Sequence, residues 1–384
     1  MRDVAVIGIG QTKVSEHWDK SLRELAGEAA LGAMMEGQVA HVDSIYVGNM
    51  LSNVANFQAQ LGSMVADWIG QRFTEAIKIE SACSSGGAAF RAAYLSVASG
   101  ESDIALAVGV EKMTDSPSAE ITAALATAAD ADYEVDHGLS FVALNALIMK
   151  RYMYEYGWKG ADFAEFAINA HENAVHNPFA RFRKPISFNQ FVNSAMICDP
   201  INLMDASPIG DGAAAAILVN AEVLTPSSEK ILVVGSSAAT DAIALHSRKH
   251  PLRLTAAEKS AKDAYQQAGI TPKDIGVFEY HDAFTIMAAL SLEAAGFIKP
   301  GYGPALAKEG AIKIDGEIPV ATMGGLKARG HPVGATGLYQ IVEIVQQLRG
   351  CAEKTQVARN TFGMAQNIDG SGSNIVTHIL KREN

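Results

Sequence analysis

The sequence predicts an α/β protein built from two related halves, and three observations support this prediction. Short apolar runs alternate with helical stretches along most of the 384 residues, an order typical of a mainly parallel sheet covered by helices. The same order of elements occurs before and after about residue 225. In each half a glycine-rich turn opens a long helix, at residues 81–87 and at residues 324–332.

The first half alternates strands and helices that are punctuated by glycine. Gly8 and Gly10 match only part of a dinucleotide-binding fingerprint, whose third glycine is missing, so the end of a strand is the favoured interpretation. We expect helices at 21–36, at 57–69 and from the 81–87 turn to Gly100. The expected strands are 4–7, 43–48, 76–80, 104–109 and a returning strand at 212–219.

The second half repeats this order of elements. We expect helices at 255–268, at 284–295 and from the 324–332 turn to Gly350. The expected strands are 231–234, 274–279, 355–362 and 374–381. The repeat is one of element order rather than of residue identity.

A different segment, residues 113–195, separates the halves. It is rich in Ala, Met, Tyr, Phe and His, and it has helical periodicity with little strand character. Insertions of this size are usually functional. We therefore expect a first half formed by 1–112 and 196–225, an inserted segment at 113–195, and a second half at 226–384.

Composition narrows the class of protein. Hydrophobic residues make up 48% and charged residues 19%, so long disorder is not expected. The formal net charge of -11 disfavours nucleic acid as the main partner. No window approaches the ~18–20 apolar residues of a membrane span, and the N-terminus lacks the apolar core of a signal peptide. Together with only three cysteines, these features predict a cytoplasmic protein without membrane partners.

Two basic clusters are candidates for binding a small anion or are simply solvated surface. One contains Arg181, Arg183 and Lys184, and the other contains Arg248, Lys249 and Arg253.

Cys83 is the first candidate for chemistry. It lies in a strand-to-helix turn of small residues, where backbone N–H groups and the helix dipole favour a thiolate and are expected to lower the thiol pKa. The alternative is a buried structural cysteine. A catalytic role for Cys83 requires a base nearby that can take the thiol proton.

The second half offers two histidines. His331 stands between Gly330 and Pro332 in the turn that corresponds to the cysteine turn, and His281 follows the strand ending at Glu279. A duplicated fold would bring the turns to one cleft, giving a Cys–His pair that activates a nucleophile. The same three residues could suggest zinc, but their distant sequence positions and the lack of a Cys-x-x-Cys motif disfavour it. No metal is expected.

Several motifs resemble those of the thiolase family, in order and spacing, over essentially the whole chain. They are Ser81-Ala-Cys-Ser-Ser-Gly-Gly87, the Asp205–Ala215 segment, His281-Asp-Ala-Phe284, Gly330-His-Pro-Val-Gly-Ala-Thr-Gly337 and Asn367-Ile-Asp-Gly-Ser-Gly372. His281-Asp282 in place of an Asn-Glu pair is most similar to the sterol-carrier-type and archaeal branch. The resemblance implies two duplicated α/β/α halves with mixed sheets that sandwich buried helices, and an inserted loop domain at 113–195 that binds CoA.

The resemblance also implies roles for single residues. Cys83 would carry the acyl group and His331 would activate it. His281 would hold a water and form one oxyanion hole with His331. The backbone N–H groups of Cys83 and Asp369 would form the other. Ser236 or Ser237 would contact the pantetheine of coenzyme A, which is substrate and product, so no cofactor is expected.

One family feature is missing. The second catalytic cysteine of thiolases would fall at Asn367 or, in sterol-carrier-type members, at Ala283. Cys198 and Cys351 are not obvious substitutes. Proton removal from acetyl-CoA therefore lacks its usual base, leaving His281, His331 or a water.

The leading hypothesis is an acetyl-CoA C-acetyltransferase that forms acetoacetyl-CoA and cleaves it in reverse, as a homodimer or tetramer. Related proteins suggest 3-hydroxy-3-methylglutaryl-CoA (HMG-CoA) synthase and a small OB-fold protein as partners in isoprenoid synthesis. One alternative is a degradative thiolase for longer or branched chains, with an acyl pocket lined by Met149, Tyr152, Met153, Tyr154 and Tyr156 unless these form a plain core stripe. Another is a weakly active or non-catalytic acyl-CoA-binding homologue, and a ketosynthase acting on acyl-carrier protein is disfavoured.

Overall fold

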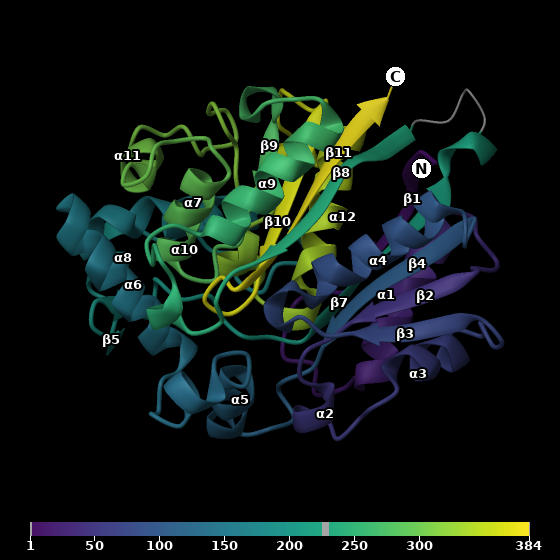
Figure 1. The fold of residues 1–384 in the computed structure, drawn as a ribbon, viewed down its shortest axis with the longest axis horizontal. Helices are drawn as coiled ribbons and strands as arrows, with labels where there is room; N and C mark the ends of the chain where they lie inside the picture. Colours follow the sequence, from purple (N-terminus) through teal and green to yellow (C-terminus); the bar gives the residue numbers. More distant parts are fainter. Residues whose placement is uncertain (1, 225–229, 384) are drawn as a thin grey trace.

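The computed structural model describes residues 2–224 and 230–383 and contains a nine-stranded mixed sheet (Figure 1). The strand order is β3-β2-β4-β7-β1-β8-β11-β10-β9. The strands are β1 (Val4–Gln11), β2 (Ser44–Gly48), β3 (Glu75–Ile79), β4 (Ile104–Glu111), β7 (Gly212–Asn220), β8 (Lys230–Thr240), β9 (Val277–Glu279), β10 (Phe362–Ile368) and β11 (Asn374–Glu383).

The sheet is duplicated about the pairing of β1 with β8. Outward from β1, the strands are β7, β4, β2 and β3; outward from β8, they are β11, β10 and β9. The sense of pairing matches: β1–β7 and β8–β11 are antiparallel, as are β4–β7 and β10–β11, whereas β2–β4 and β9–β10 are parallel. A parallel bridge between Phe278 and Val320 stands where the second half would have its counterpart of β3. This confirms the predicted duplicated, mixed α/β fold. The expectation of mainly parallel strands is wrong, because β7 and β11 run antiparallel to both their neighbours.

Helices cover the sheet on both faces. Those that pack on its strands are α1 (Leu22–Glu36), α3 (Leu61–Trp68), α4 (Ser85–Ser99), α9 (Thr255–Ala268) and α12 (Thr336–Arg349). The helices α2 (Ser52–Ala55), α10 (Thr285–Ala294) and α11 (Gly303–Lys308) contact mainly other helices. Their ends follow local sequence: Ser21 and Glu24 form a capping box on α1, and α4 and α12 stop at left-handed Gly100 and Gly350.

Helices α4 and α12 lie in the centre of the molecule. Phe90 and Val97 of α4 share one hydrophobic cluster with Leu338 and Ile341 of α12, and strands of both halves contribute to it. Nearly every residue of α12 is buried, as expected for a helix surrounded by protein. The two helices begin close together, so the glycine-rich turns that open them are brought to one place.

The inserted segment 113–195 is mainly helical, as predicted, and lies at the left and bottom of Figure 1. Its helices α6 (Phe141–Tyr156) and α7 (Ala164–Ala174) pack against α10. A short hairpin of β5 (Met196–Cys198) and β6 (Ile201–Asn202) leads back to the sheet. The segment's helices are α5 (Ser118–Ala126), α6 (Phe141–Tyr156), α7 (Ala164–Ala174) and α8 (Phe188–Val192).

Most predicted elements are present, with several differences in their bounds. The strand predicted at 231–234 continues to Thr240 as β8, and the strand predicted at 274–279 begins only at Val277. The strand predicted at 355–362 is wrong: Glu353–Thr355 form a 3-10 turn, and the strand is Phe362–Ile368. The helix predicted at 57–69 is shorter, beginning at Leu61 after the separate turn of α2. The predicted boundary at 225/226 falls outside the described residues. No described helix is long and apolar enough to cross a membrane.

Candidate active site

Cys83 lies in a 3-10 turn (Ala82–Ser84) between β3 and α4. The turn is held by its own polar groups: Ala82 has a φ of 46° and donates its N–H to Oε1 of Glu80 at 2.6 Å. Burial raises the pKa of the Cys83 thiol to about 12, although a hydrogen bond from the N–H of Gly370 favours the thiolate. The expectation of a lowered thiol pKa is therefore wrong for this site, because desolvation outweighs the helix N-terminus. The resting thiol is protonated.

His331 lies in the equivalent turn before α12. Its backbone N–H donates to the carbonyl of Pro208 at 3.1 Å, which fixes the turn against the first half. Its Nδ1 lies 2.7 Å from Oγ1 of Thr336, at the start of α12. Burial, followed by the neighbouring His281 and Arg329, lowers the pKa of His331 well below its usual range, so the ring is neutral.

His281 follows β9 and is held by β10. The backbone N–H of Ile368 donates to Nδ1 of His281 at 3.3 Å, and Nδ2 of Asn367 lies at the same distance. Burial lowers the pKa of His281 to about 3, with a smaller effect from Arg329. Because Nδ1 accepts, the proton of the neutral ring is on Nε2.

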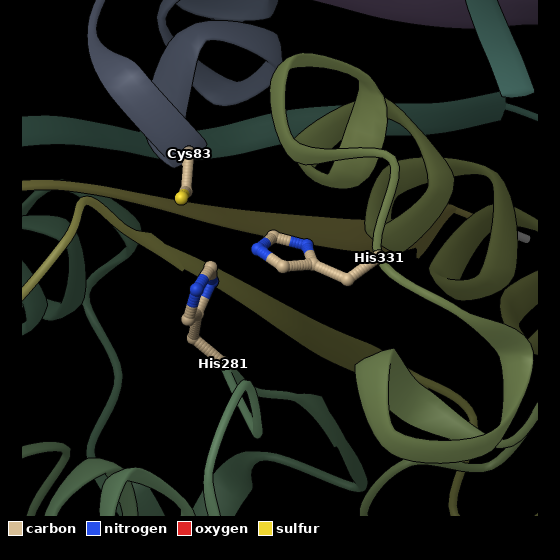
Figure 2. Close-up of side chains that lie close together, drawn as sticks. All are labelled: Cys83, His281 and His331. Carbon is tan, nitrogen blue, oxygen red and sulfur yellow. The ribbon is translucent and has the colours of Figure 1, made fainter. Parts of the chain in front are cut away.

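The fold brings these three side chains together (Figure 2). One ligand-type atom of each lies within 4.8 Å of the other two, and the imidazole rings meet edge-to-face with centroids 5.3 Å apart. All three are buried. The predicted meeting of Cys83, His281 and His331 is thus found in the structure. The distant sequence positions of these residues are no argument against zinc, because the fold brings their side chains together. One sulfur and two nitrogens would fit a zinc ion with one open coordination position.

A cavity of about 190 Å³ lies over the three residues. Its walls are mainly apolar, and the inserted segment supplies one of them through Thr122, Leu125, Ser140, Phe141 and Val142. Such a wall excludes water from the thiol and leaves the two rings as the main polar groups that a ligand would meet. None of the Met and Tyr residues of α6 suggested for an acyl pocket lines it; Met149 and Tyr152 belong to the core instead.

The structure corrects the predicted oxyanion donor. The N–H of Asp369 donates to the carbonyl of Asn374 at 3.0 Å, closing the β10–β11 turn, and it is not available to a substrate. The next amide, that of Gly370, faces the Cys83 sulfur, and Gly370 lines the cavity. A side chain at Gly370 would meet the ring of Phe141. The amide that is free to face the cavity is thus one residue further along the chain, because the turn between β10 and β11 uses Asp369 for its own hydrogen bonds.

Ser236 and Ser237 are buried within β8 and do not line the cavity. The hydroxyl of Ser236 accepts a hydrogen bond from Arg91 at 3.0 Å. The structure therefore does not support their predicted contact with pantetheine.

The predicted basic clusters are mostly paired within the protein. Arg248 is buried and donates to the carbonyl and hydroxyl of Ser371, whereas Arg181 and Arg253 form ion pairs with Glu16 and Glu258.

Sequence reasoning missed Glu111, which joins the two halves beneath the site. Its carboxylate accepts N–H groups of Met50, Leu51 and Gly334 at 3.0–3.1 Å, and the side-chain amide of Asn49 at 2.8 Å. It thereby ties the turn after His331 to the end of β2. Its place in a Glu-Lys-Met-Thr motif at the end of a strand was the only available signal.

A buried ion pair lies behind the histidines. Nε of Arg329 is 2.7 Å from Oε1 of Glu343, and the guanidinium stands 4.7 Å from the centre of the Tyr339 ring. Both charged side chains are almost fully buried. The positive charge of Arg329 helps to keep His281 and His331 neutral.

Comparisons with known proteins agree with this arrangement. Residues 4–222 match the family description "Thiolase, N-terminal domain", and residues 237–382 match "Thiolase C-terminal domain-like". The chain is 44% identical to acetyl-CoA acetyltransferase of Methanothermobacter thermautotrophicus over the whole of both chains. It is 30% identical to sterol carrier protein 2 of Bos taurus, over 97% of this chain and 71% of that protein.

The fold is also found among solved structures. Human mitochondrial 3-ketoacyl-CoA thiolase in complex with CoA superposes with a TM-score of 0.77 at 17% identity, covering all of this chain and 98% of that one. The duplicated sheet, the converging cysteine and histidines, and the whole-length similarity lead to one conclusion. This chain belongs to the thiolase family and is an acyltransferase.

Proposed function

We propose that this protein transfers acyl groups between CoA thioesters through an acyl-enzyme on Cys83. The observation that carries the proposal is the convergence of the Cys83 thiol, His281 and His331 in one apolar cavity. A thiol with a raised pKa beside a neutral imidazole does not ionise at rest. The proton moves to His331 as the sulfur attacks the thioester, which is general-base activation of a nucleophile.

Two sets of donors would stabilise the negative charge that develops on oxygen. The Nε2–H of His281 is left free by the bond at Nδ1, and it would polarise a thioester carbonyl that enters the space between the three side chains. The backbone N–H groups of Cys83 and Gly370 would serve the tetrahedral intermediate formed at the sulfur. Donors fixed by the fold before the reaction begins cost no reorganisation in the transition state.

The proposed reaction is condensation of two acetyl-CoA to acetoacetyl-CoA and CoA, with thiolysis as its reverse. The 44% identity to an acetyl-CoA acetyltransferase supports this choice. Coenzyme A would enter beside the inserted segment 113–195, whose side chains already wall the cavity. No cofactor or metal enters the proposed steps.

Thiolysis with a graded set of substrates tests this proposal. We expect acetoacetyl-CoA to be cleaved by CoA with a higher kcat/KM than 3-ketohexanoyl-CoA or longer homologues. Equal kcat/KM across the series would contradict the short-chain assignment and favour a degradative role with longer or branched chains.

The exposed edge of the sheet at β3 supports a proposal for the oligomeric state. Strand β3 ends the sheet, is only partly buried, and is flanked by fully exposed Phe73. An edge strand whose outer side is unpaired and carries exposed apolar side chains favours pairing with another chain. We propose a homodimer, alone or within a tetramer, in which this edge is covered.

We also propose a cytoplasmic, biosynthetic role. Because the condensation is uphill, a following enzyme must consume acetoacetyl-CoA, and HMG-CoA synthase in isoprenoid synthesis has the required chemistry. A small OB-fold protein is the proposed bridge between the two enzymes. Size-exclusion chromatography of this protein mixed with those two candidates would test the assembly. Elution of the three proteins as one complex, with acetoacetyl-CoA converted without release into solution, supports it. Separate elution of the three proteins contradicts it.

A further inference from the structure

Carbon–carbon bond formation needs a base that removes a proton from the methyl group of the second acetyl-CoA. Among the described residues that line the cavity, the titratable groups are Cys83, His281 and His331. Cys83 carries the acyl group at this stage, so its sulfur cannot act as a base. Cys198 and Cys351 lie on other parts of the surface and do not line the cavity. The base is therefore one of the two histidines or a water.

His281 is arranged as a donor. The N–H of Ile368 can only donate, so Nδ1 of His281 must accept, and the ring proton is on Nε2. Asn367 strengthens this arrangement. Its Oδ1 accepts the N–H of Gly87 at 3.1 Å, which turns its Nδ2 toward the same Nδ1 of His281. The amide that replaces the family's second thiol thus fixes the tautomer of His281.

His331 is arranged as an acceptor. Oγ1 of Thr336 lies 2.7 Å from Nδ1 of His331 and 3.5 Å from the carbonyl oxygen of Pro332. Because that carbonyl can only accept, we assign the hydroxyl proton to it, as for hydroxyl side chains in the first turn of a helix, and infer that Nδ1–H of His331 donates to Oγ1. The lone pair of His331 is then on Nε2. Figure 2 shows this ring directed toward the space between Cys83 and His281.

We propose that His331 is the single base of this enzyme and acts in both half-reactions, while His281 acts only as a hydrogen-bond donor. This inference rests on the proposed acyl-enzyme. In the first half-reaction, Nε2 of His331 takes the Cys83 thiol proton as the sulfur attacks acetyl-CoA. The C–S bond of acetyl-CoA breaks, and the departing CoA thiolate takes the proton from His331.

His331 is then neutral again, and the acetyl thioester on Cys83 needs no base. In the second half-reaction, the C–H bond of the incoming acetyl group breaks and its proton goes to Nε2 of His331. The electron pair left on carbon attacks the acetyl carbonyl on Cys83. Collapse expels the Cys83 thiolate, which recovers the proton from His331, and acetoacetyl-CoA leaves. Each proton taken is returned within its own half-reaction.

Variants at the two histidines separate their roles. His281→Asn keeps an N–H donor but removes any base. We expect it to acetylate Cys83 and to form acetoacetyl-CoA in a single turnover within about tenfold of the wild-type rate. His331→Asn cannot take a proton, and loss of a general base costs about 10²–10⁴-fold.

The His331→Asn enzyme is first loaded at Cys83 by long incubation with S-phenyl thioacetate at high pH, where hydroxide takes the thiol proton and the leaving group needs no protonation. It is then returned to neutral pH and mixed with acetyl-CoA. We expect single-turnover condensation to fall by about 10²–10⁴-fold. Adding Ala283→Cys to this variant places a second thiol on the cavity wall and should restore part of that rate, which also shows that the fold is intact.

Two results would overturn the proposal. One is His281→Asn that still acetylates Cys83 but loses condensation by more than about 10³-fold, a loss larger than that of a removed oxyanion donor and on the scale of a removed general base. The other is acetylated His331→Asn that condenses at the wild-type rate, which would indicate a water as base. Failure of the wild-type enzyme to acetylate Cys83 is a different result, because it would reject the acyl-enzyme itself.

Discussion

Nδ1 of His331 lies 2.7 Å from Oγ1 of Thr336, so the first residue of α12 orients the ring that faces Cys83. The side chains of Thr336 and His331 are both buried. The orientation and tautomer of His331 therefore depend on one hydrogen bond within its own turn.

Thr336→Val removes that bond while keeping the shape of the side chain. A buried N–H left without a partner costs about 1–3 kcal/mol, so we expect kcat to fall about tenfold to a hundredfold. KM for acetoacetyl-CoA should change by less than about threefold, because the interaction acts on the base rather than on binding. Steady-state thiolysis measures both constants. Thr336→Ser is the matched control and should keep most activity; equal kcat values for the Ser and Val variants would contradict the role of the hydroxyl.

Acid should destabilise the fold through its buried histidines. Burial lowers the pKa of His378 to about 3, and its Nε2 donates to the carbonyl of Gly87 at 3.0 Å. Below about pH 6.5 the unfolded chain binds a proton that the folded ring does not, so stability is complete above that pH and falls as pH decreases toward 3. Each such histidine contributes a slope of about 1.4 kcal/mol per pH unit.

Urea unfolding of His378→Gln between pH 4.5 and 6 tests this. Gln keeps a donor for Gly87 but takes up no proton, so its stability should fall less steeply than that of the wild type by about 1.4 kcal/mol per pH unit. The control is His41→Gln at an exposed position, which should keep the wild-type slope. An unchanged slope in His378→Gln would show that this ring is not held neutral.

Breaking the buried Arg329–Glu343 ion pair should lower the free energy of unfolding strongly. Arg329→Met leaves the Glu343 carboxylate without its partner, and loss of one member of a buried pair costs about 3–5 kcal/mol. The double variant Arg329→Met with Glu343→Leu removes both charges and should recover much of that loss. Denaturant unfolding at pH 7 compares the two.

The exposed pair Arg151–Glu155 provides the matched surface control. Arg151→Met should change the unfolding free energy by less than about 1 kcal/mol. A double variant at 329 and 343 that is no more stable than Arg329→Met would contradict the account of an uncompensated charge.

The edge of the sheet should determine the assembly state. Ile77 lies in β3, and 44% of it is exposed in the single chain. Ile77→Lys would place a charge in a covered interface, so we expect analytical ultracentrifugation to show a shift from dimer toward monomer. Met35→Lys, at an exposed position of α1, should leave the assembly unchanged. A wild-type monomer, or an Ile77→Lys protein of unchanged mass, would contradict the proposed interface.

The sequence was most informative at the two glycine-rich turns, where a candidate catalytic residue occupies equivalent positions of the two repeated halves. Cys83 and His331 each stand in a glycine-rich turn before a long helix, and the repeated order of strands was enough to predict that these turns meet. His281 could be added because it follows a buried strand of the same half. The motif spacing, rather than any single residue, carried this prediction.

Details that depend on burial or on single turns could not be predicted in this way. The thiol pKa is raised because the whole cavity excludes water, which no local pattern records. The backbone amide that faces the Cys83 sulfur is that of Gly370 rather than Asp369, because the Asp369 amide closes the β10–β11 turn. Ser236 and Ser237 lie beyond the predicted strand 231–234 but are interior positions of the longer strand β8. Glu111 acts across the two halves, and its partners are distant in sequence.

The central claim is that Cys83 carries the acyl group. It is tested most directly by incubating the enzyme with acetyl-CoA, quenching in acid and mapping the modified peptide by mass spectrometry. We expect one acetyl group on the peptide containing Cys83, released by added CoA and absent from Cys83→Ala. Two results would contradict this claim. One is a Cys83→Ala protein that is acetylated as the wild type is. The other is a wild-type enzyme that produces acetoacetyl-CoA but carries no acetyl group at any time.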